Sequence, residues 1–146
     1  MDAAPKHLRS GEISPHNFQS LFYVYYFIAH NSIMVTTKKK ILIIDDEQDL
    51  CLLLESYFIR KNYEVHSANS LAAGITEMQQ VHPDILFLDN NLPDGIGWSK
   101  VESFIHVNPA LRLFLMSGYP PTFPNIPGFS YEVLIKPISF ADLEGL

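Results

Sequence analysis

Hydrophobic residues in the last two thirds of the chain recur in short blocks that alternate between two spacings. Uninterrupted apolar runs rich in β-branched residues are typical of strands buried on both faces of a sheet. Between these runs, apolar residues recur three and four positions apart, which is the helical spacing. The predicted strands cover residues 41–44, 64–68, 85–88, 111–116 and 133–135.

The first two intervals between strands predict amphipathic helices. After residue 47, apolar residues recur at positions i, i+3, i+4, i+7 and i+8, namely Leu50, Leu53, Leu54, Tyr57 and Phe58. Ser70 is a suitable N-cap for a second helix that extends to about Val81, because Pro83 does not permit the helix to continue. Both helices would place an apolar face against the predicted strands.

Two further helices complete the alternation. One is expected from about Trp98 to Val107, after a loop that contains Pro93 and Gly95, and a short one begins with Ser139. Five buried strands separated by crossover segments imply an α/β fold with a parallel sheet and right-handed connections.

The interval before the last strand departs from this alternation. It contains four prolines within eight residues: Pro120, Pro121, Pro124 and Pro127. Because an interior proline costs a helix about 3 kcal/mol, we expect a loop or a single 3₁₀ turn here. The last helix has room for only about two turns before residue 146. A fifth strand with an exposed flank would favour a homodimer.

Polar residues follow the apolar runs at the strand ends. They are Asp45 and Asp46 after the first strand, Asp89 after the third, Ser117 after the fourth and Lys136 after the fifth. In parallel sheets, ligands bind beyond the carboxyl ends of the strands. We therefore expect these five side chains to form one polar site.

The residue types at this edge suit phosphoryl chemistry. Neighbouring carboxylates stay ionised around a hard divalent cation, and Mg²⁺ accepts two carboxylates, a backbone carbonyl and several waters. Asp89 is then a candidate nucleophile that forms an acyl phosphate. Lys136 would neutralise phosphoryl charge, and Ser117 would donate its hydroxyl. The blander alternatives are an acidic helix N-terminus at residues 45–47 and ordinary turn residues elsewhere.

Four sequence motifs carry a resemblance to a known family. They are IIDDE at 43–47, LDNNLPDGIGW at 88–98, MSGY at 116–119 and KP at 136–137. With these motifs, residues 38–146 resemble the receiver domain of bacterial two-component response regulators, in the CheY-like superfamily. The resemblance implies a flavodoxin-like strand order of 2-1-3-4-5, with helices on both faces of the sheet.

The resemblance also implies a role for each residue at this edge. Asp89 would be the phosphoacceptor, assisted by Lys136 and Ser117. The Mg²⁺ ligands would be the carboxylates of Asp46 and Asp89, the backbone carbonyl of Asn91 and, through water, Asp45. Receivers usually carry an aromatic switch residue three positions before the lysine, where this chain has Val133. Tyr131 is expected on the same strand face and is the tentative substitute.

Residues 1–35 are predicted to be an N-terminal extension, and residues 36–146 the receiver domain. The leading 33 residues are neutral, so the net charge of −6 lies in residues 34–146. Three interpretations of the extension stay open: a non-native start upstream of Met34, a docking or dimerising helix that begins near Ser14, and membrane association. The apolar run 21–29 is too short to span a bilayer, which takes about 20 residues.

The leading functional hypothesis is a stand-alone, cytoplasmic phosphoacceptor that signals through partner binding and is not an enzyme. The resemblance implies a sensor histidine kinase or a histidine phosphotransfer protein as the phosphodonor. The acidic composition does not favour a nucleic-acid partner. A phosphorylation-independent binding module is the alternative. An aspartate-nucleophile phosphatase is disfavoured, because such enzymes need a second Asp where this chain has Asn91.

Overall fold

The computed structural model describes residues 22–26, 37–119 and 122–146, and Thr37–Leu146 form one compact unit. Its centre is a five-stranded sheet of parallel neighbours in the order β2-β1-β3-β6-β7. The strands are β1 (Lys40–Ile44), β2 (Glu64–Ala68), β3 (Ile85–Asp89), β6 (Arg112–Ser117) and β7 (Glu132–Ile135). In chain order this is 2-1-3-4-5, which confirms the predicted fold class.

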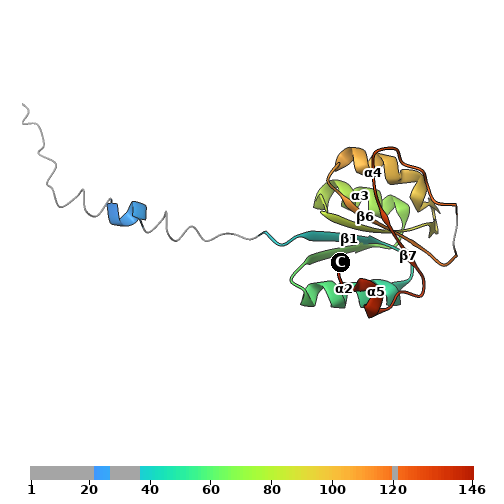
Figure 1. Cartoon of the computed structure of the whole chain (residues 1–146), viewed down its shortest axis with the longest axis horizontal. Coiled ribbons are helices and arrows are strands. Elements are labelled where there is room, and N and C mark those ends of the chain that lie inside the picture. The colour runs from blue at the N-terminus through green and yellow to red at the C-terminus, as the bar shows by residue number, and fades with distance from the viewer. Residues whose placement is uncertain (1–21, 27–36, 120–121) are drawn as a thin grey trace, which may run out of the picture. The chain divides into compact units, whose positions relative to one another are not determined.

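Helices cover both faces of this sheet (Figure 1). One face carries α3 (Leu71–Val81) and α4 (Val101–Val107), which follows the 3₁₀ helix η1 (Gly97–Lys100). The other face carries α2 (Gln48–Arg60) and the short α5 (Phe140–Leu143). All four helices predicted after residue 47 are confirmed, except that the third begins with a 3₁₀ turn.

The central strands are buried because helices pack on both of their faces. Every residue from Ile41 to Ile44 is completely buried. Leu42 and Ile44 join the core beneath α3 and α4, whereas Ile41 and Ile43 join the core beneath α2. Because neighbouring strands are parallel, their carboxyl ends all lie at the same edge of the sheet.

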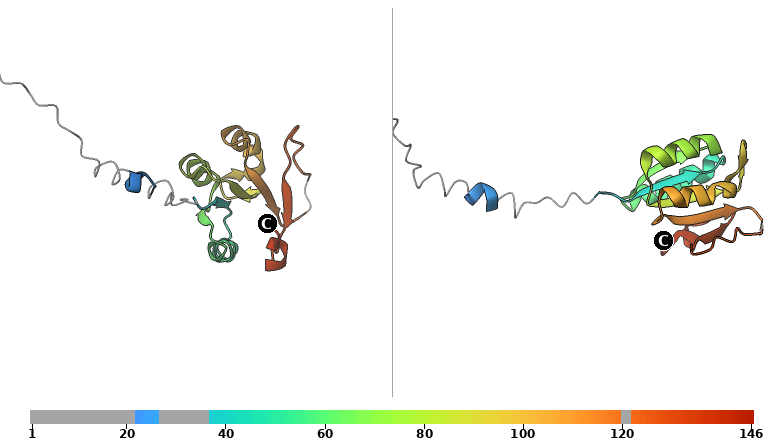
Figure 2. Two further views of the ribbon diagram at one scale, coloured as in Figure 1. Left: turned by 60° about the vertical axis from the view of Figure 1, so that its left-hand side comes forward. Right: turned by 90° about the horizontal axis from the view of Figure 1, so that it is seen from above.

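The described part of the segment between β6 and β7 contains no helix, as the prolines predicted. Residues 122–131 form a loop, visible in both views of Figure 2. Its only regular feature is a turn in which the Phe129 N–H donates to the Ile126 carbonyl at 3.2 Å. Ile126, Phe129 and Tyr131 pack against the core beneath α3 and α4. Isolated side chains therefore cover the surface that a helix would otherwise bury.

One small element was not expected from the sequence. After Asp89 the chain forms a two-stranded antiparallel hairpin, β4 (Asn91–Leu92) and β5 (Gly95–Ile96). Two-residue strands carry no periodic signal, so pattern analysis predicts only a loop here. The hairpin matters because it follows the candidate phosphoacceptor directly.

Most of the predicted N-terminal helix lies outside the described residues. Residues 22–26 are helical, and their five apolar side chains are all exposed. Over the ranges that the structure describes, no helix is both long and apolar enough to cross a membrane.

Candidate functional site

Three strand ends bring a lysine between two carboxylates. Lys136, directly after β7, places its Nζ 2.8 Å from Asp45 Oδ2 and 2.8 Å from Asp89 Oδ1. Asp45 follows β1, and Asp89 is the last residue of β3. Because β7 lies at the edge of the sheet and two strands, β3 and β6, separate it from β1, the long lysine side chain reaches across the carboxyl ends. The structure thus joins three of the predicted site residues.

Burial and the ion pairs together set the pKa values of Lys136 and Asp45. Asp45 and Asp89 are 1% and 4% exposed. Burial alone lowers the pKa of Lys136, but hydrogen bonds to Asp45, Asp89 and Glu47 outweigh it and raise the pKa above its usual value. Lys136 is therefore cationic at neutral pH. Burial raises the pKa of Asp45, while the contact with Lys136 opposes that shift.

Backbone amides hold the two aspartates in place. Asp45 Oδ1 accepts from the N–H of Glu47 at 2.9 Å, and Asp89 Oδ2 accepts from the N–H of Asn91 at 2.6 Å. Both carboxylates thus have one oxygen on the lysine and one on the turn that follows their strand. This arrangement orients Asp89 before any ligand is bound.

A third carboxylate at this lysine was not predicted. Glu47 Oε1 lies 2.7 Å from Lys136 Nζ. In the sequence, Glu47 is recognisable only as part of the acidic run after the first strand. No local spacing connects it to a lysine 89 positions later, so only the folded chain reveals the contact.

The hairpin after Asp89 is tied to the body of the domain. Asp94 accepts from the N–H groups of Leu71 and Ala72, at 2.6 and 2.8 Å, and so caps α3 from a distant loop. Gly97 lies against the backbone of Asp89, where an added Cβ would collide with the Asp89 carbonyl oxygen. The roles of Asp94 and Gly97 were not predicted.

Ser117 lies at the same edge, at the end of β6, and is 5% exposed. Its Oγ accepts from the Tyr119 N–H at 3.4 Å, and its carbonyl accepts from the Lys136 N–H at 2.8 Å. The backbone of Ser117 thereby positions the lysine. Among the described residues, the Ser117 hydroxyl makes no hydrogen bond to Asp89.

Tyr131 lies just before β7 and is half-buried. Its hydroxyl donates to the Pro124 carbonyl at 2.6 Å, so it fastens the proline-rich loop. In the same loop Phe123 stacks on Trp98, with ring centroids 5.8 Å apart. Trp98 in turn donates its indole N–H to the carbonyl of Leu88, next to Asp89, at 3.2 Å. The loop is therefore connected to the site through one aromatic pair, Phe123–Trp98, and one hydrogen bond, from Trp98 to Leu88.

The remaining predicted ligands lie at the rim. Asp46 and Asn91 are exposed, beside the buried Asp45 and Asp89. Within the described part of the chain, no three or more His, Cys, Asp or Glu side chains converge as a metal cluster. The donor set fits a cation that takes few protein carboxylates and keeps water ligands, as Mg²⁺ does.

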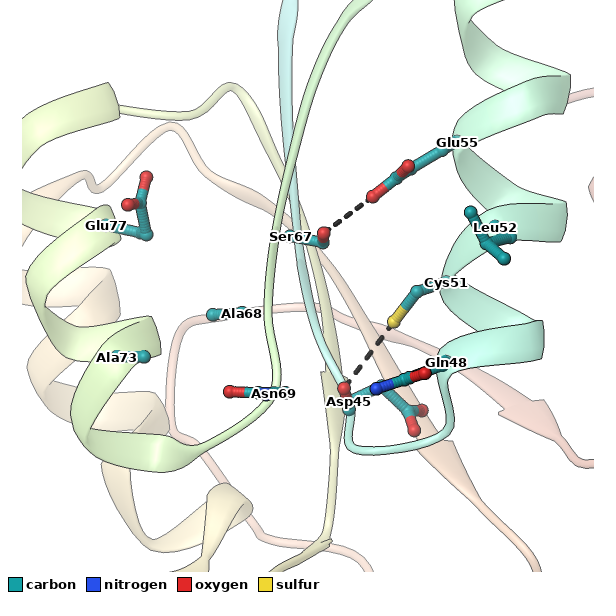
Figure 3. A pocket seen from close by; sticks show the side chains of 10 residues that line it. All are labelled: Asp45, Gln48, Cys51, Leu52, Glu55, Ser67, Ala68, Asn69, Ala73 and Glu77. Carbon is teal, nitrogen blue, oxygen red and sulfur yellow. Dashed lines mark hydrogen bonds between the residues drawn. The ribbon is translucent and has the colours of Figure 1, made fainter.

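A pocket of about 430 Å³ lies beside the site, around the end of β2 (Figure 3). Cys51 and Glu55 of α2 line one side, and Ala73 and Glu77 of α3 line the other. Burial raises the pKa of the Cys51 thiol to about 11, so this thiol stays neutral. Its Sγ contacts the Asp45 carbonyl at 3.5 Å, which is a packing role.

Comparison with known sequences identifies the family. The family described as response regulator receiver domain matches residues 41–144, which is more than half of the chain. The chain therefore belongs to the response regulator receiver family, and the predicted resemblance is confirmed. No similar sequence was found among curated proteins.

Solved receiver structures share the fold. A CheY-like receiver domain from Methylobacillus flagellatus has a TM-score of 0.64 and 22% identity, over 74% of this chain and 94% of that one. A response regulator from Clostridium difficile has a TM-score of 0.63 and 23% identity, over 73% and 89%. The regulator TrrA from Thermotoga maritima, solved with Mg²⁺ and BeF, has a TM-score of 0.62 and 21% identity, over 72% and 92%.

Proposed function

We propose that this receiver accepts a phosphoryl group on Asp89 from a phosphohistidine and signals through phosphorylation-dependent partner binding. The observation that carries the proposal is the position of Lys136, whose ammonium contacts a buried Asp89 already oriented by a backbone amide. A buried carboxylate beside a fixed cation is suited to an in-line attack on phosphorus, because the cation balances the charge that accumulates. Family membership supports the same reading.

The proposed reaction is a simple transfer. A carboxylate oxygen of Asp89 attacks the phosphorus, and a P–O bond forms as the P–N bond of the phosphohistidine breaks. The bonding electron pair returns to the imidazole nitrogen, and neutral imidazole leaves because the other ring nitrogen carries a proton. Lys136 holds a phosphoryl oxygen, and the Ser117 hydroxyl donates to another. Tyr131 is the proposed responsive aromatic residue, since it connects β7 to the proline-rich loop.

Mg²⁺ is the proposed cofactor. Asp46, Asp89 and the carbonyl of Asn91 would hold it, with Asp45 acting through water. The division between Asp45 and Asp46 suits the structure, because Asp46 is exposed at the rim whereas Asp45 is buried and paired with Lys136. When bound, the ion neutralises carboxylate and phosphoryl charge.

The proposed partners are a sensor histidine kinase or a phosphotransfer protein, in the cytoplasm, where phosphorelays draw on ATP. A CheX–CheY complex from Borrelia burgdorferi is among the similar structures. The proposed role is that of a stand-alone module of residues 36–146, with 1–35 as an extension. A homodimer through the open flank of β7 is a further proposal, because this strand pairs only with β6 among the described strands.

The test is intact-mass spectrometry after incubation with acetyl phosphate, with and without Mg²⁺. We expect a Mg²⁺-dependent gain of one phosphoryl group in the wild type and none in Asp89→Asn, which keeps the shape of the side chain but loses the nucleophile. Lys136→Ala should label at least about 100-fold more slowly, as expected when one charge that stabilises the transition state is removed.

Labelling of Asp89→Asn at the wild-type rate would remove Asp89 from this role. No labelling of the wild type, with Mg²⁺ still bound, would favour the alternative of a phosphorylation-independent binding module. A partner pull-down with wild type and Asp89→Asn would then show equal recovery.

A further inference from the structure

Glu47 precedes α2, but its side chain does not cap that helix. It is the N-cap residue of α2, yet its side chain makes no capping hydrogen bond. Helices prefer Ser, Thr, Asp or Asn there because those side chains accept from the exposed N–H groups. The carboxylate of Glu47 contacts Lys136 instead, at 2.7 Å, the shortest of the three contacts at that ammonium.

Three carboxylates surround the ammonium of Lys136, and the one that accepts a well-aligned hydrogen bond from it is that of Glu47. An ammonium carries three N–H donors, and three carboxylates lie within 2.8 Å of Nζ: those of Asp45, Glu47 and Asp89. A phosphoryl oxygen that binds this nitrogen must compete with these carboxylates for it. The resting site therefore contains a competitor for the lysine.

Exposure decides which carboxylate leaves. The side chains of Asp45 and Asp89 are 0% and 6% exposed, and each is also held by a backbone amide. The side chain of Glu47 is 60% exposed, so its carboxylate regains water when it is released. Breaking the pair with Asp45 or Asp89 would leave a buried carboxylate uncompensated, whereas release of Glu47 leaves Lys136 with two carboxylate partners.

We propose that Glu47 is a positioning residue that holds Lys136 in the unphosphorylated state and is exchanged for a phosphoryl oxygen when Asp89 is modified. This inference rests on the proposed phosphoacceptor function. One N–H···O bond from Lys136 to Glu47 breaks, one to the phosphoryl group forms, and no proton is transferred. Glu47 thus opposes phosphorylation, both by occupying the lysine and by repelling the incoming anion.

The test compares Glu47→Gln and Glu47→Ala with the wild type. The probe is beryllofluoride at saturating Mg²⁺, followed by the fluorescence of Trp98, the single tryptophan, and by calorimetry. We expect both variants to bind beryllofluoride about two- to five-fold more tightly, the range that an exposed ion pair supports. Asp45 and Asp89 still hold the lysine, so the Mg²⁺ affinity should change less than about two-fold.

Glu102→Gln is the matched control, because it removes the same charge from an exposed position on α4. It should leave the affinity for beryllofluoride unchanged. Added salt should reduce the advantage of Glu47→Gln, since exposed charges are screened. A merely structural role would lower the melting temperature without tightening the binding of the anion.

The outcomes separate the two proposals. Wild-type protein that binds beryllofluoride, with Glu47 variants that bind equally or more weakly, overturns the role of Glu47 and leaves the phosphoacceptor function standing. Weaker Mg²⁺ binding in the variants would make Glu47 part of the metal site, which also overturns it. Wild-type protein that neither binds beryllofluoride nor becomes labelled by acetyl phosphate overturns both.

Discussion

The crossover from β1 to β2 and the crossover from β6 to β7 both join parallel neighbours, but they differ in structure. The segment from β1 to β2 contains the 13-residue helix α2, whereas the described part of the segment from β6 to β7 contains no helix. Both return the chain to the start of a neighbouring parallel strand. Strand order therefore does not require a helix in every crossover, only enough chain to span the strand.

The two segments differ in how much apolar surface they cover. Helix α2 buries Cys51, Leu54 and Phe58 because its apolar residues repeat with the helical period. The loop contributes half-buried side chains at irregular positions, and it leaves Ile135 of β7 46% exposed. We infer that the α2 side supplies most of the stability, while the loop side is held by a few specific contacts.

The largest loss of stability is expected from a substitution in the core beneath α2. Phe58 is 1% exposed and packs against Tyr63 and Phe87, with ring centroids 5.6 and 5.3 Å away. Phe58→Ala should lower the free energy of unfolding by about 3–5 kcal/mol, because it removes a buried ring and leaves a cavity. Urea denaturation measures this. Leu52→Ala on the exposed face of the helix is the control, and a comparable loss there would contradict the comparison.

A smaller loss of stability is expected where Phe123 of the loop contacts Trp98. Phe123→Ala removes a stacked but partly exposed ring and should cost about 1 kcal/mol, the usual value of an aromatic pair. The emission of Trp98 should shift to the red as water reaches the indole. If unfolding shows a loss as large as that of Phe58→Ala, the loop is as much a part of the core as α2.

Removing the hydroxyl of Tyr131 should lower the free energy of unfolding by a similar or smaller amount. Tyr131→Phe deletes the hydrogen bond to the Pro124 carbonyl, and a net loss of about 0.5–1.5 kcal/mol is expected. Tyr119→Phe is the control, because Tyr119 is 80% exposed. If Tyr131 also carries the signal of phosphorylation, beryllofluoride should change the hydrogen exchange of residues 122–131 less in Tyr131→Phe than in the wild type.

The smallest effect concerns the hairpin that caps α3, and it depends on pH. Hydrogen bonds from Ala72 and Leu71 lower the pKa of Asp94 below its ordinary value of 3.8. The unfolded chain binds this proton first, so the stabilisation is present above about pH 4 and lost as the pH falls through the lower folded pKa. Asp94→Asn should reduce the melting temperature by a few degrees near neutral pH.

This difference between Asp94→Asn and the wild type should narrow as the pH is lowered from about 6 to about 3. Glu102→Gln serves again as a control for loss of a surface charge. A difference that stays constant over this range would mean that the ionised carboxylate is not what holds the hairpin to α3.

Much of the fold was predictable because its signals are local. Continuous runs such as residues 41–44 read as buried strands, and the prolines excluded a helix between β6 and β7. Asp45, Asp89 and Lys136 were also predicted to share one polar site, because each follows a strand and parallel strands have their carboxyl ends at one edge of the sheet. The structure then brought these three side chains together.

The sequence by itself determined the strands, their parallel arrangement and the chemistry available at one edge of the sheet, since each depends on residue type and short-range spacing. The tertiary structure decided which groups meet. Glu47 reaches Lys136 across 89 positions, and Asp94 reaches Leu71 across 23. Such contacts depend on how crossovers and loops return over the sheet, and the free energy of that packing is distributed over the whole core.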